Sequence, residues 1–185
     1  LHEPYRRQRQ MCIRDRKSTS RNISGYPRQK GKGQSALRKM ESLEIRHMTA
    51  EDVPAAALIE RQNFTLPWEE ESFFQALEKK ETIYLTAFAH GKVVGYVGMW
   101  TVLDEGEITN VSVKKECQGQ HIGRRLLTAL EDEGRKRGIE TFFLEVRKSN
   151  APAIHLYESC GFTAQGIRKN FYENPREDGI LMCKR

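Results

Sequence analysis

The feature that most constrains the fold of this chain is the change of pattern across residues 111–138. The segment reads VSVKKECQGQHIGRRLLTALEDEGRKRG. Its start alternates like a strand, a short polar loop with two glycines follows, and apolar residues recur at helical spacing from Ile122 until Gly138, a typical helix stop. Such a strand, loop and helix directs free backbone N–H groups and the positive end of the helix dipole at one spot, which suits a phosphate.

This loop suggests a phosphate site but does not identify one. Arg124 and Arg125 add positive charge beside it, yet polar turns that contain glycine are common in α/β proteins. Its spacing matches neither GxxxxGK(S/T) nor GxGxxG, so a P-loop or a Rossmann cofactor is disfavoured. From the residues alone, a phosphate-binding loop and an ordinary turn both stay open.

The rest of the chain from residue 43 alternates between strand and helix patterns. Thr49, with Asp52 three residues on, is placed to cap the first helix. We expect strands over residues 43–48, 82–89, 93–102, 105–113, 141–146, 162–169 and 180–184, and helices over residues 49–63, 69–80, 122–137 and 151–160. The order βααβββαβαββ predicts an α/β domain with a mixed sheet.

The charge of the chain is unevenly distributed. The formal net charge is +6, but residues 1–40 hold 12 Lys or Arg and two acids, so residues 41–185 carry a net charge of −4. A mildly acidic folded part does not predict direct nucleic-acid binding by that domain. No apolar run is long enough to cross a bilayer, so we expect no membrane partner.

The four cysteines, Cys12, Cys117, Cys160 and Cys183, form no CxxC pair. Free thiols in a reducing cytoplasm are the simplest interpretation of this spacing. Cys117 and His121 lie four residues apart, but no second ligand pair accompanies them in the sequence, so we expect no metal site.

Residues 1–42 are rich in Arg, Gln, Ser and Gly and show no sustained periodicity. We therefore expect a disordered basic tail before a single domain of residues 43–185. Residues 11–16, MCIRDR, resemble a translated sequencing-library adapter. One interpretation is an assembly artefact, with the natural start near Met40. The other is a genuine basic arm that binds RNA or lipid.

A more specific pattern lies in residues 144–162, which read LEVRKSNAPAIHLYESCGF. With this segment, residues 43–185 resemble the GNAT family of N-acetyltransferases, and within it the RimI-type ribosomal-protein alanine N-acetyltransferases. In that family a Gln/Arg-x-x-Gly-x-Gly/Ala loop binds the pyrophosphate of acetyl-CoA. Gln118, Ile122 and Gly123 match this loop, whereas His121 replaces its first glycine and Gly119 stands where a basic residue is common.

The histidine in this loop has two open explanations. Glycine at such a position lets the backbone approach a phosphate closely and adopt a positive φ angle. Histidine tolerates the left-handed region better than most residues, so the loop need not collapse around His121. Its imidazole either donates a hydrogen bond to the pyrophosphate or merely crowds the loop.

The resemblance implies a GNAT fold, with a mixed central sheet of about six to seven strands, helices on both faces and a splayed parallel strand pair that binds acetyl-CoA. In the family, N–H groups of the strand that corresponds to residues 111–113 hold the pantetheine arm and polarise the thioester carbonyl. The implied cofactor-binding residues are Val111, Ser112, Val113, Gly119, Gln120, His121, Ile122, Gly123, Arg124 and Asn150. The residues themselves are equally compatible with a plain strand at 111–113 and an ordinary helix cap at Asn150.

Acetyl transfer to an amine needs a neutral amine, a polarised carbonyl and a proton for the departing thiolate. An α-amine has a pKa of about 7.7–8.0, so a carboxylate can assist its deprotonation. Glu145 interrupts an apolar strand near its carboxyl end, where open α/β sheets place ligands, although a solvated strand-end glutamate would look the same. The resemblance implies that Tyr157 is the general acid, and a core aromatic packed on Ala153 is the alternative.

For the acceptor, residues 65–70 and 168–179 resemble segments that line the peptide groove of the RimI-type enzymes. The candidate contacts are Trp68, Asn170, Phe171 and Tyr172, with packing of surface loops as the alternative. The implied activity is direct transfer from acetyl-CoA to a protein N-terminal α-amine in a ternary complex, most closely the alanine of small-subunit ribosomal protein S18. Acetylation of a small amine or antibiotic, and acyl-CoA binding without catalysis, are the other candidates. The presence of both Glu145 and Tyr157 argues against the last.

Overall fold

The computed structural model describes residues 43–185, so the expectations for residues 1–42 lie outside the described residues. Within this range the predicted order of strands and helices is confirmed. The strands are β1 (Leu43–His47), β2 (Thr82–Ala89), β3 (Lys92–Val102), β4 (Glu105–Val113), β5 (Thr141–Arg147), β6 (Thr163–Glu173) and β7 (Arg176–Lys184). The helices are α3 (Val53–Asn63), α4 (Glu70–Leu77), α5 (Ile122–Lys136) and α6 (Ala151–Ser159), with 3-10 turns at η1 (Ala50–Asp52) and η2 (Lys115–Cys117).

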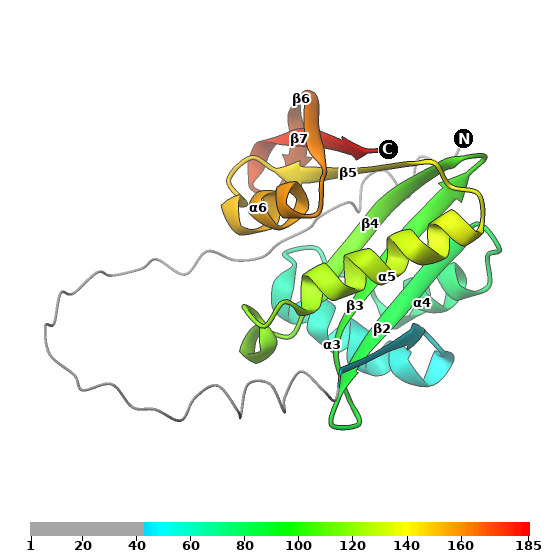
Figure 1. Ribbon diagram of the computed structural model, residues 1–185. Helices are drawn as coiled ribbons and strands as arrows, with labels where there is room; N and C mark the ends of the chain where they lie inside the picture. Colours follow the sequence, from blue (N-terminus) through cyan, green and yellow to red (C-terminus); the bar gives the residue numbers. More distant parts are fainter. Residues whose placement is uncertain (1–42) are drawn as a thin grey trace, which may run out of the picture.

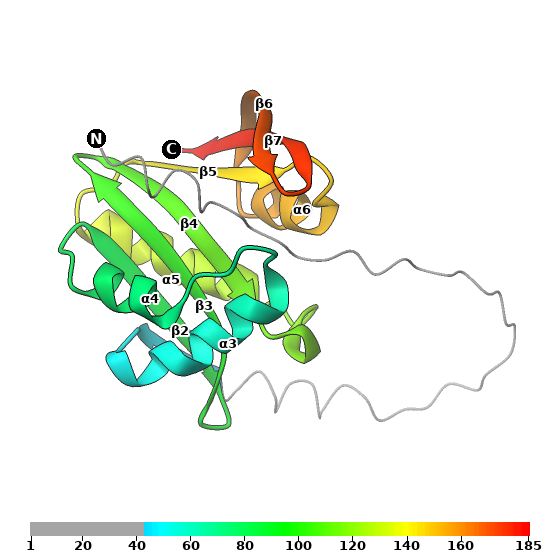
Figure 2. The same cartoon turned by 180° about the vertical axis from the view of Figure 1, so that it is seen from behind.

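The strands form one mixed sheet of seven strands in the order β1-β2-β3-β4-β5-β7-β6. β4 and β5 are parallel, and the other neighbouring pairs are antiparallel. Helix α5 lies on one face of β2, β3 and β4, and α3 and α4 lie on the opposite face (Figures 1 and 2). The expected mixed sheet with helices on both faces is therefore confirmed. None of the helices within residues 43–185 is long and apolar enough to cross a membrane.

The parallel strands β4 and β5 stay together for only a short distance. Ladder pairing joins residues 105–107 to residues 141–143, and beyond it the strands separate (Figure 1). At this level β4 carries one extra residue, Thr109, where the register shifts opposite Gly98 and Met99. A bulge of this kind bends its strand and increases its twist, which accounts for the turn of β4 away from β5. The splayed parallel pair implied by the family resemblance is present.

Two apolar cores lie on the two faces of the sheet. The larger core includes a stripe of α5 at helical spacing, made of Ile122, Leu126, Leu127 and Leu130. The smaller core lies under α3 and α4, where Phe73 packs edge to face on Tyr96 with ring centroids 5.3 Å apart. The sheet is thus fixed from both sides at β3 and β4.

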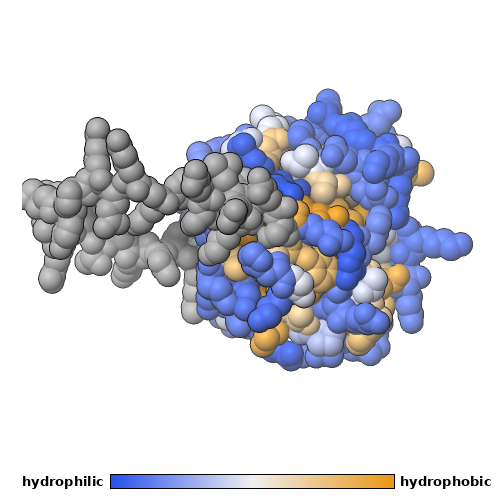
Figure 3. Space-filling model, turned by 60° about the horizontal axis from the view of Figure 1, so that its bottom comes forward, coloured by the Kyte–Doolittle hydropathy of each residue, from blue (hydrophilic) through white to orange (hydrophobic). Residues whose placement is uncertain are grey.

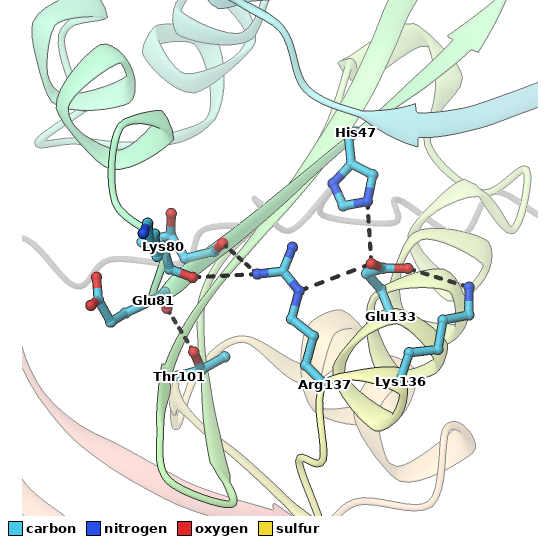
Figure 4. Close-up of polar contacts among 8 residues, drawn as sticks. His47, Lys80, Glu81, Thr101, Glu133, Lys136 and Arg137 are labelled. Carbon is cyan, nitrogen blue, oxygen red and sulfur yellow. Dashed lines mark hydrogen bonds and ion pairs between the residues drawn. The ribbon is translucent and has the colours of Figure 1, made fainter.

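Polar contacts tie the C-terminal end of α5 to the first strands of the sheet (Figure 4). Arg137 donates hydrogen bonds to the carbonyl oxygens of Lys80 at 3.4 Å and Thr82 at 3.3 Å. One turn earlier, Glu133 pairs with His47 of β1 at 3.3 Å. With its far end held in this way, α5 keeps a fixed direction, so the loop at its N-terminus has a defined place.

The C-terminal hairpin has longer strands than the sequence suggested. β6 continues to Glu173 and β7 begins at Arg176, so most of the residues expected in a surface loop are strand residues. The pairing shifts register between Arg168 and Tyr172, and Asn170 between them has a positive φ of 52°. This irregularity on a largely exposed strand hides the two-residue alternation, which explains why the sequence predicted shorter strands.

A buried carboxyl group joins the smaller core to β4. Glu60 of α3 is buried and accepts a hydrogen bond from the hydroxyl of Tyr96. Its other oxygen faces the side-chain amide of Asn110 and the backbone N–H of Trp68, each at 3.4 Å. Burial raises the pKa of the Glu60 carboxyl to about 8, and these hydrogen bonds only partly offset that effect. Helix α3, the α3–α4 connection and strands β3 and β4 therefore meet at one carboxyl group.

We predict that the free energy of unfolding of Glu60→Gln rises relative to that of the unsubstituted protein as the pH rises from about 4.5 to about 8. The reason is that only the unsubstituted protein has this titrating group. An unfolded glutamate with the ordinary pKa of 4.5 releases its proton in this window, whereas folded Glu60 keeps it, so the native free energy of unfolding falls with rising pH. Urea unfolding at several pH values measures the difference. Glu51→Gln, at an exposed glutamate, is the control. A Glu60→Gln difference that stayed constant with pH would contradict the prediction.

Candidate active site

Beyond the point where β4 leaves β5, a cavity of about 360 Å³ lies between the end of β4, the loop before α5, and α6. Its lining includes seven of the ten predicted cofactor-binding residues, Val111, Val113, Gly119, His121, Ile122, Gly123 and Arg124. The structure therefore brings the predicted strand and the predicted loop to a single opening.

The loop before α5 has the backbone conformation that its glycines and histidine suggested. His121 caps the helix with a φ of 59° and a ψ of 12°, and Gly119 has a φ of 73°. The expectation that histidine tolerates the left-handed region at this position is therefore confirmed. Gln118 donates a side-chain hydrogen bond to the carbonyl oxygen of Val113 at 3.1 Å, which folds the loop back on β4. Helix α5 thus presents its N-terminus, with the positive end of its dipole, to the cavity.

Three predicted cofactor-binding side chains do not line the cavity. Ser112 is buried, and its hydroxyl accepts a hydrogen bond from Asn63 of α3 at 2.8 Å. Gln120 is exposed and donates to the carbonyl oxygen of Glu116 at 3.3 Å. Asn150 accepts a hydrogen bond from the backbone N–H of Ala153, in the first turn of α6, at 3.3 Å, so the helix-cap interpretation of this residue is confirmed.

Of the two arginines expected beside the loop, only Arg124 lines the cavity. Arg125 does not add charge there, because its guanidinium donates a hydrogen bond to the carbonyl oxygen of Leu43 at 2.9 Å. Arg124 also donates to the carbonyl oxygen of Ser159 at 3.0 Å, which links α5 to α6. The α6 residues in the wall were not predicted, although their spacing marks one face of a helix: Pro152, His155, Leu156 and Ser159.

The cavity wall combines apolar side chains from β4 and both helices with polar groups of the loop. Figure 3 shows one face of the molecule on which hydrophobic side chains gather near the centre, with hydrophilic side chains beside them. A lining with an apolar part and a cationic end suits a long ligand that has an alkyl-rich portion and a phosphate portion.

Glu145 lies on β5 opposite Leu181 of β7, beyond the last ladder pair with β4. It is buried, with 8% of its surface exposed, so the alternative of a solvated strand-end glutamate is wrong. Its carboxylate pairs with the guanidinium of Arg168 from β6, a residue that the sequence did not single out. The carboxylate is therefore held in place by a partner of opposite charge at the edge of the opened sheet.

Tyr157 of α6 is fully buried in the larger core. Its ring packs on Phe162 with centroids 6.0 Å apart, so it has the packing role that the sequence left open. Burial, with smaller contributions from Tyr172 and Cys160, raises the pKa of Tyr157 well above its ordinary value. Neither Glu145 nor Tyr157 is among the residues that line the cavity described above.

The hairpin of β6 and β7 is anchored by a buried arginine. Arg147, two residues after Glu145, donates to the carbonyl oxygens of Asn174 at 2.9 Å and Pro175 at 3.0 Å. It also pairs with Glu177 at 3.2 Å and lies over the ring of Tyr172, 4.3 Å from its centroid. The turn of the hairpin is thereby fixed to the strand that carries Glu145.

The four predicted acceptor residues fall into two groups. Phe171, Tyr172 and Asn170 lie together on the hairpin, where the rings of Phe171 and Tyr172 pack edge to face with centroids 5.0 Å apart. Asn170 is exposed, and its backbone N–H donates to Asp178 at 2.9 Å. Trp68 belongs to the smaller core and packs on Phe73 with centroids 5.5 Å apart. Its ring is a packing group, and its backbone is held by Glu60.

Comparisons of the sequence with known proteins agree with this geometry. The model of the acetyltransferase (GNAT) family matches residues 42–162. The ribosomal protein bS18-alanine N-acetyltransferase of Escherichia coli (strain K12) is 40% identical over 141 residues, which cover 75% of this chain and 95% of that protein. The enzyme of the same name from Haemophilus influenzae is 35% identical over 130 residues, with 68% of this chain and 86% of that protein covered.

The fold is shared with solved structures of similar proteins. The crystal structure of the ribosomal-protein-S18-alanine N-acetyltransferase from Escherichia coli matches with a TM-score of 0.70 at 39% identity, over 76% of this chain and 92% of that chain. Ribosomal-protein-alanine N-acetyltransferase from Brucella melitensis matches with a TM-score of 0.68 at 29% identity, over 76% of this chain and 98% of that chain. Together with the parted strands and the loop before α5, these matches establish that the chain belongs to the GNAT family of acetyltransferases.

Proposed function

We propose that the protein transfers the acetyl group of acetyl-CoA to the N-terminal α-amine of a ribosomal protein, with the alanine of small-subunit protein S18 as its target. The observation that carries this proposal is the buried carboxylate of Glu145 at the edge of β5 where β4 has turned away. Two relatives with 35–40% identity are named for this reaction, which favours a protein N-terminus over a small amine. We expect the protein to act in the cytoplasm, where ribosomal proteins are made.

The cavity suits acetyl-CoA at both ends. We assign the pyrophosphate to the loop of residues 118–123, where the N-terminus of α5 and the Arg124 side chain supply positive potential. The pantetheine arm then follows residues 111–113. β4 pairs with β3 along one edge and has left β5 on the other, so backbone groups on that second edge face the wedge. Their N–H groups are suited to polarise the thioester carbonyl.

Glu145 and Tyr157 divide the proton transfers in this proposal. The substrate ammonium gives one proton to Glu145, directly or through water, and from there to solvent. The neutral amine attacks the thioester carbon, the C–S bond breaks, and the nitrogen loses its second proton to the same carboxylate. Tyr157, whose raised pKa keeps its hydroxyl protonated at neutral pH, gives its proton to the departing thiolate. The second proton held by Glu145 then passes through solvent to Tyr157, which restores both groups. The reaction releases one proton overall, which matches the conversion of an ammonium into an amide.

The substrate class is tested by acetyl-CoA turnover on peptides that begin with Ala, Ser, Met or Thr, alongside spermidine and an aminoglycoside. We expect the peptide with the N-terminal sequence of S18 to be acetylated fastest. The same peptide with a blocked N-terminus is the control and should give no turnover. Turnover of the polyamine or the aminoglycoside without turnover of any peptide would replace this proposal with the small-amine alternative.

Glu145→Gln should lower kcat for the alanine peptide on the order of 10² to 10⁴-fold, because the amide keeps the shape of the side chain but cannot accept a proton. Tyr157→Phe should likewise slow the reaction by removing the proton donor for the thiolate. Acetyl-CoA affinity, measured by calorimetry, should stay close to the native value in both variants. Glu158→Gln, an exposed neighbour on α6, is the control. Native turnover at pH 7 in Glu145→Gln would remove Glu145 from the mechanism.

His121→Gly should raise the Kd for acetyl-CoA, because the change removes an imidazole N–H that can donate a hydrogen bond to the pyrophosphate. Calorimetric titration at pH 6 and at pH 8 measures the effect. His90→Gly is a matched control, since His90 also has a positive φ, of 53°, but lies in the β2–β3 turn. Tighter binding by His121→Gly at both pH values would mean that the histidine only crowds the loop.

A further inference from the structure

The guanidinium of Arg168 lies between two predicted site residues. It pairs with the carboxylate of Glu145 and stands over the ring of Phe171, 4.8 Å from the ring centroid. A carboxylate on one side and an aromatic face on the other form a receptor for a cation, since the first supplies charge and the second supplies the quadrupole of its ring. In the free protein, Arg168 occupies that receptor.

Gly179 of β7 leaves room for the Arg168 side chain of β6 to reach Glu145 on β5. Arg147, Gly179 and Arg168 are neighbours across β5, β7 and β6, so no side chain stands between the outer strands in this row. A Cβ atom at Gly179 would lie 3.1 Å from the Phe171 ring, so the ring covers the glycine backbone closely. Glu145 points to the same face as Arg147 because the two are two positions apart on one strand, with only Val146 between them. Arg168 can therefore reach Glu145 across β7.

The two members of the ion pair differ in their freedom to move. The side chain of Glu145 is 4% exposed, whereas that of Arg168 is 42% exposed. Arg147, by contrast, is 4% exposed and is bound to two backbone carbonyl oxygens and Glu177. Of these two arginines, Arg168 is the one whose own charge can move into solvent, and another cation must then take its place beside the buried Glu145 carboxylate.

We propose that Glu145 and Phe171 form the ammonium-binding slot of the acceptor site, that Arg168 fills it in the free protein, and that the α-ammonium group of the substrate takes its place. Arg168 is thus a positioning residue that keeps the Glu145 side chain paired and oriented until the acceptor arrives. This inference rests on the proposed function, because it assigns the acceptor amine to Glu145. The exchange replaces one cation with another, so Glu145 never loses its partner during substrate entry.

The same exchange favours release of the product. Acetylation converts the ammonium group into a neutral amide, which has no charge to offer the carboxylate. Arg168 can then return to Glu145 and displace the product. Binding should therefore discriminate between a peptide with a free N-terminus and the same peptide after acetylation.

The test compares Kd values for a short alanine peptide with a free N-terminus and for its N-acetylated form, each titrated into the full protein saturated with CoA. Arg168→Met keeps the length of the side chain but removes the competing cation. If the native pair is closed in about nine molecules in ten, its removal should lower the Kd of the free peptide about tenfold. The Kd of the acetylated peptide should change little. Arg168→Lys should restore competition, and Lys169→Met removes a neighbouring charge as a control.

Three outcomes would overturn the proposed slot. In the first, the free peptide binds Arg168→Met no more tightly than it binds the native protein. In the second, the affinities of the free and the acetylated peptide rise equally. In the third, the higher affinity for the free peptide persists when Glu145→Gln is added to Arg168→Met. Melting temperatures of all variants show whether the fold is kept, and Arg168→Gln serves as a second variant if Arg168→Met is unstable. If the native protein acetylates the peptide but the slot fails, the proposed function stands. If the native protein acetylates only small amines, the proposed function fails first.

Discussion

The separation of β4 from β5 is the constraint on which the rest of the site depends. A parallel pair that continued to the strand ends would leave no free strand edge for a ligand, because its backbone N–H and C=O groups would be hydrogen-bonded to each other. Here the ladder stops after residues 105–107 and 141–143, at the level where Thr109 forms the bulge in β4. The opened edge of β4, the N-terminus of α5 and one face of α6 then line one cavity. A local backbone irregularity thereby produces a binding site without an additional domain.

Three buried charged or titratable groups join separate segments around the opened sheet. Glu60 joins α3 and the Trp68 backbone to β3 and β4, Arg147 fixes the turn of the C-terminal hairpin, and Glu145 of β5 pairs with Arg168 of β6. Buried ionic groups add little net stability compared with apolar packing, because desolvation offsets their attraction. Their value here is geometric, since each holds a segment next to the opened edge in one orientation.

The sequence predicted the elements well because each carried a local signal. The helix from Ile122, its stop at Gly138 and the left-handed position at His121 all follow from spacing and from residue types that suit those conformations. The family resemblance supplied the splayed pair and the cofactor loop, neither of which residues 111–113 specify by themselves. These features were recoverable because they depend on residues close together in the chain.

Features that depend on distant residues were not recoverable in this way. The pairing of Arg168 with Glu145 joins β6 to β5 across 23 positions, and an exposed arginine in an irregular strand gives no local signal of it. Arg125 looked like part of the loop, but helical geometry turns it toward β1. For Trp68 the sequence left a groove contact and packing both open, and its ring lies in the core below α3 and α4. In each case the side-chain direction was decided by packing that the sequence does not display.

A crystal structure with a bisubstrate compound, in which the sulfur of CoA is linked through an acetyl group to the nitrogen of an alanine peptide, tests the central claim most directly. The pantetheine arm should lie in the wedge beside residues 111–113, and the alanine nitrogen should lie within hydrogen-bonding distance of Glu145. The guanidinium of Arg168 should have moved away from that carboxylate. A compound bound on another face, or a Glu145–Arg168 pair that stays intact with the peptide in place, would contradict this account.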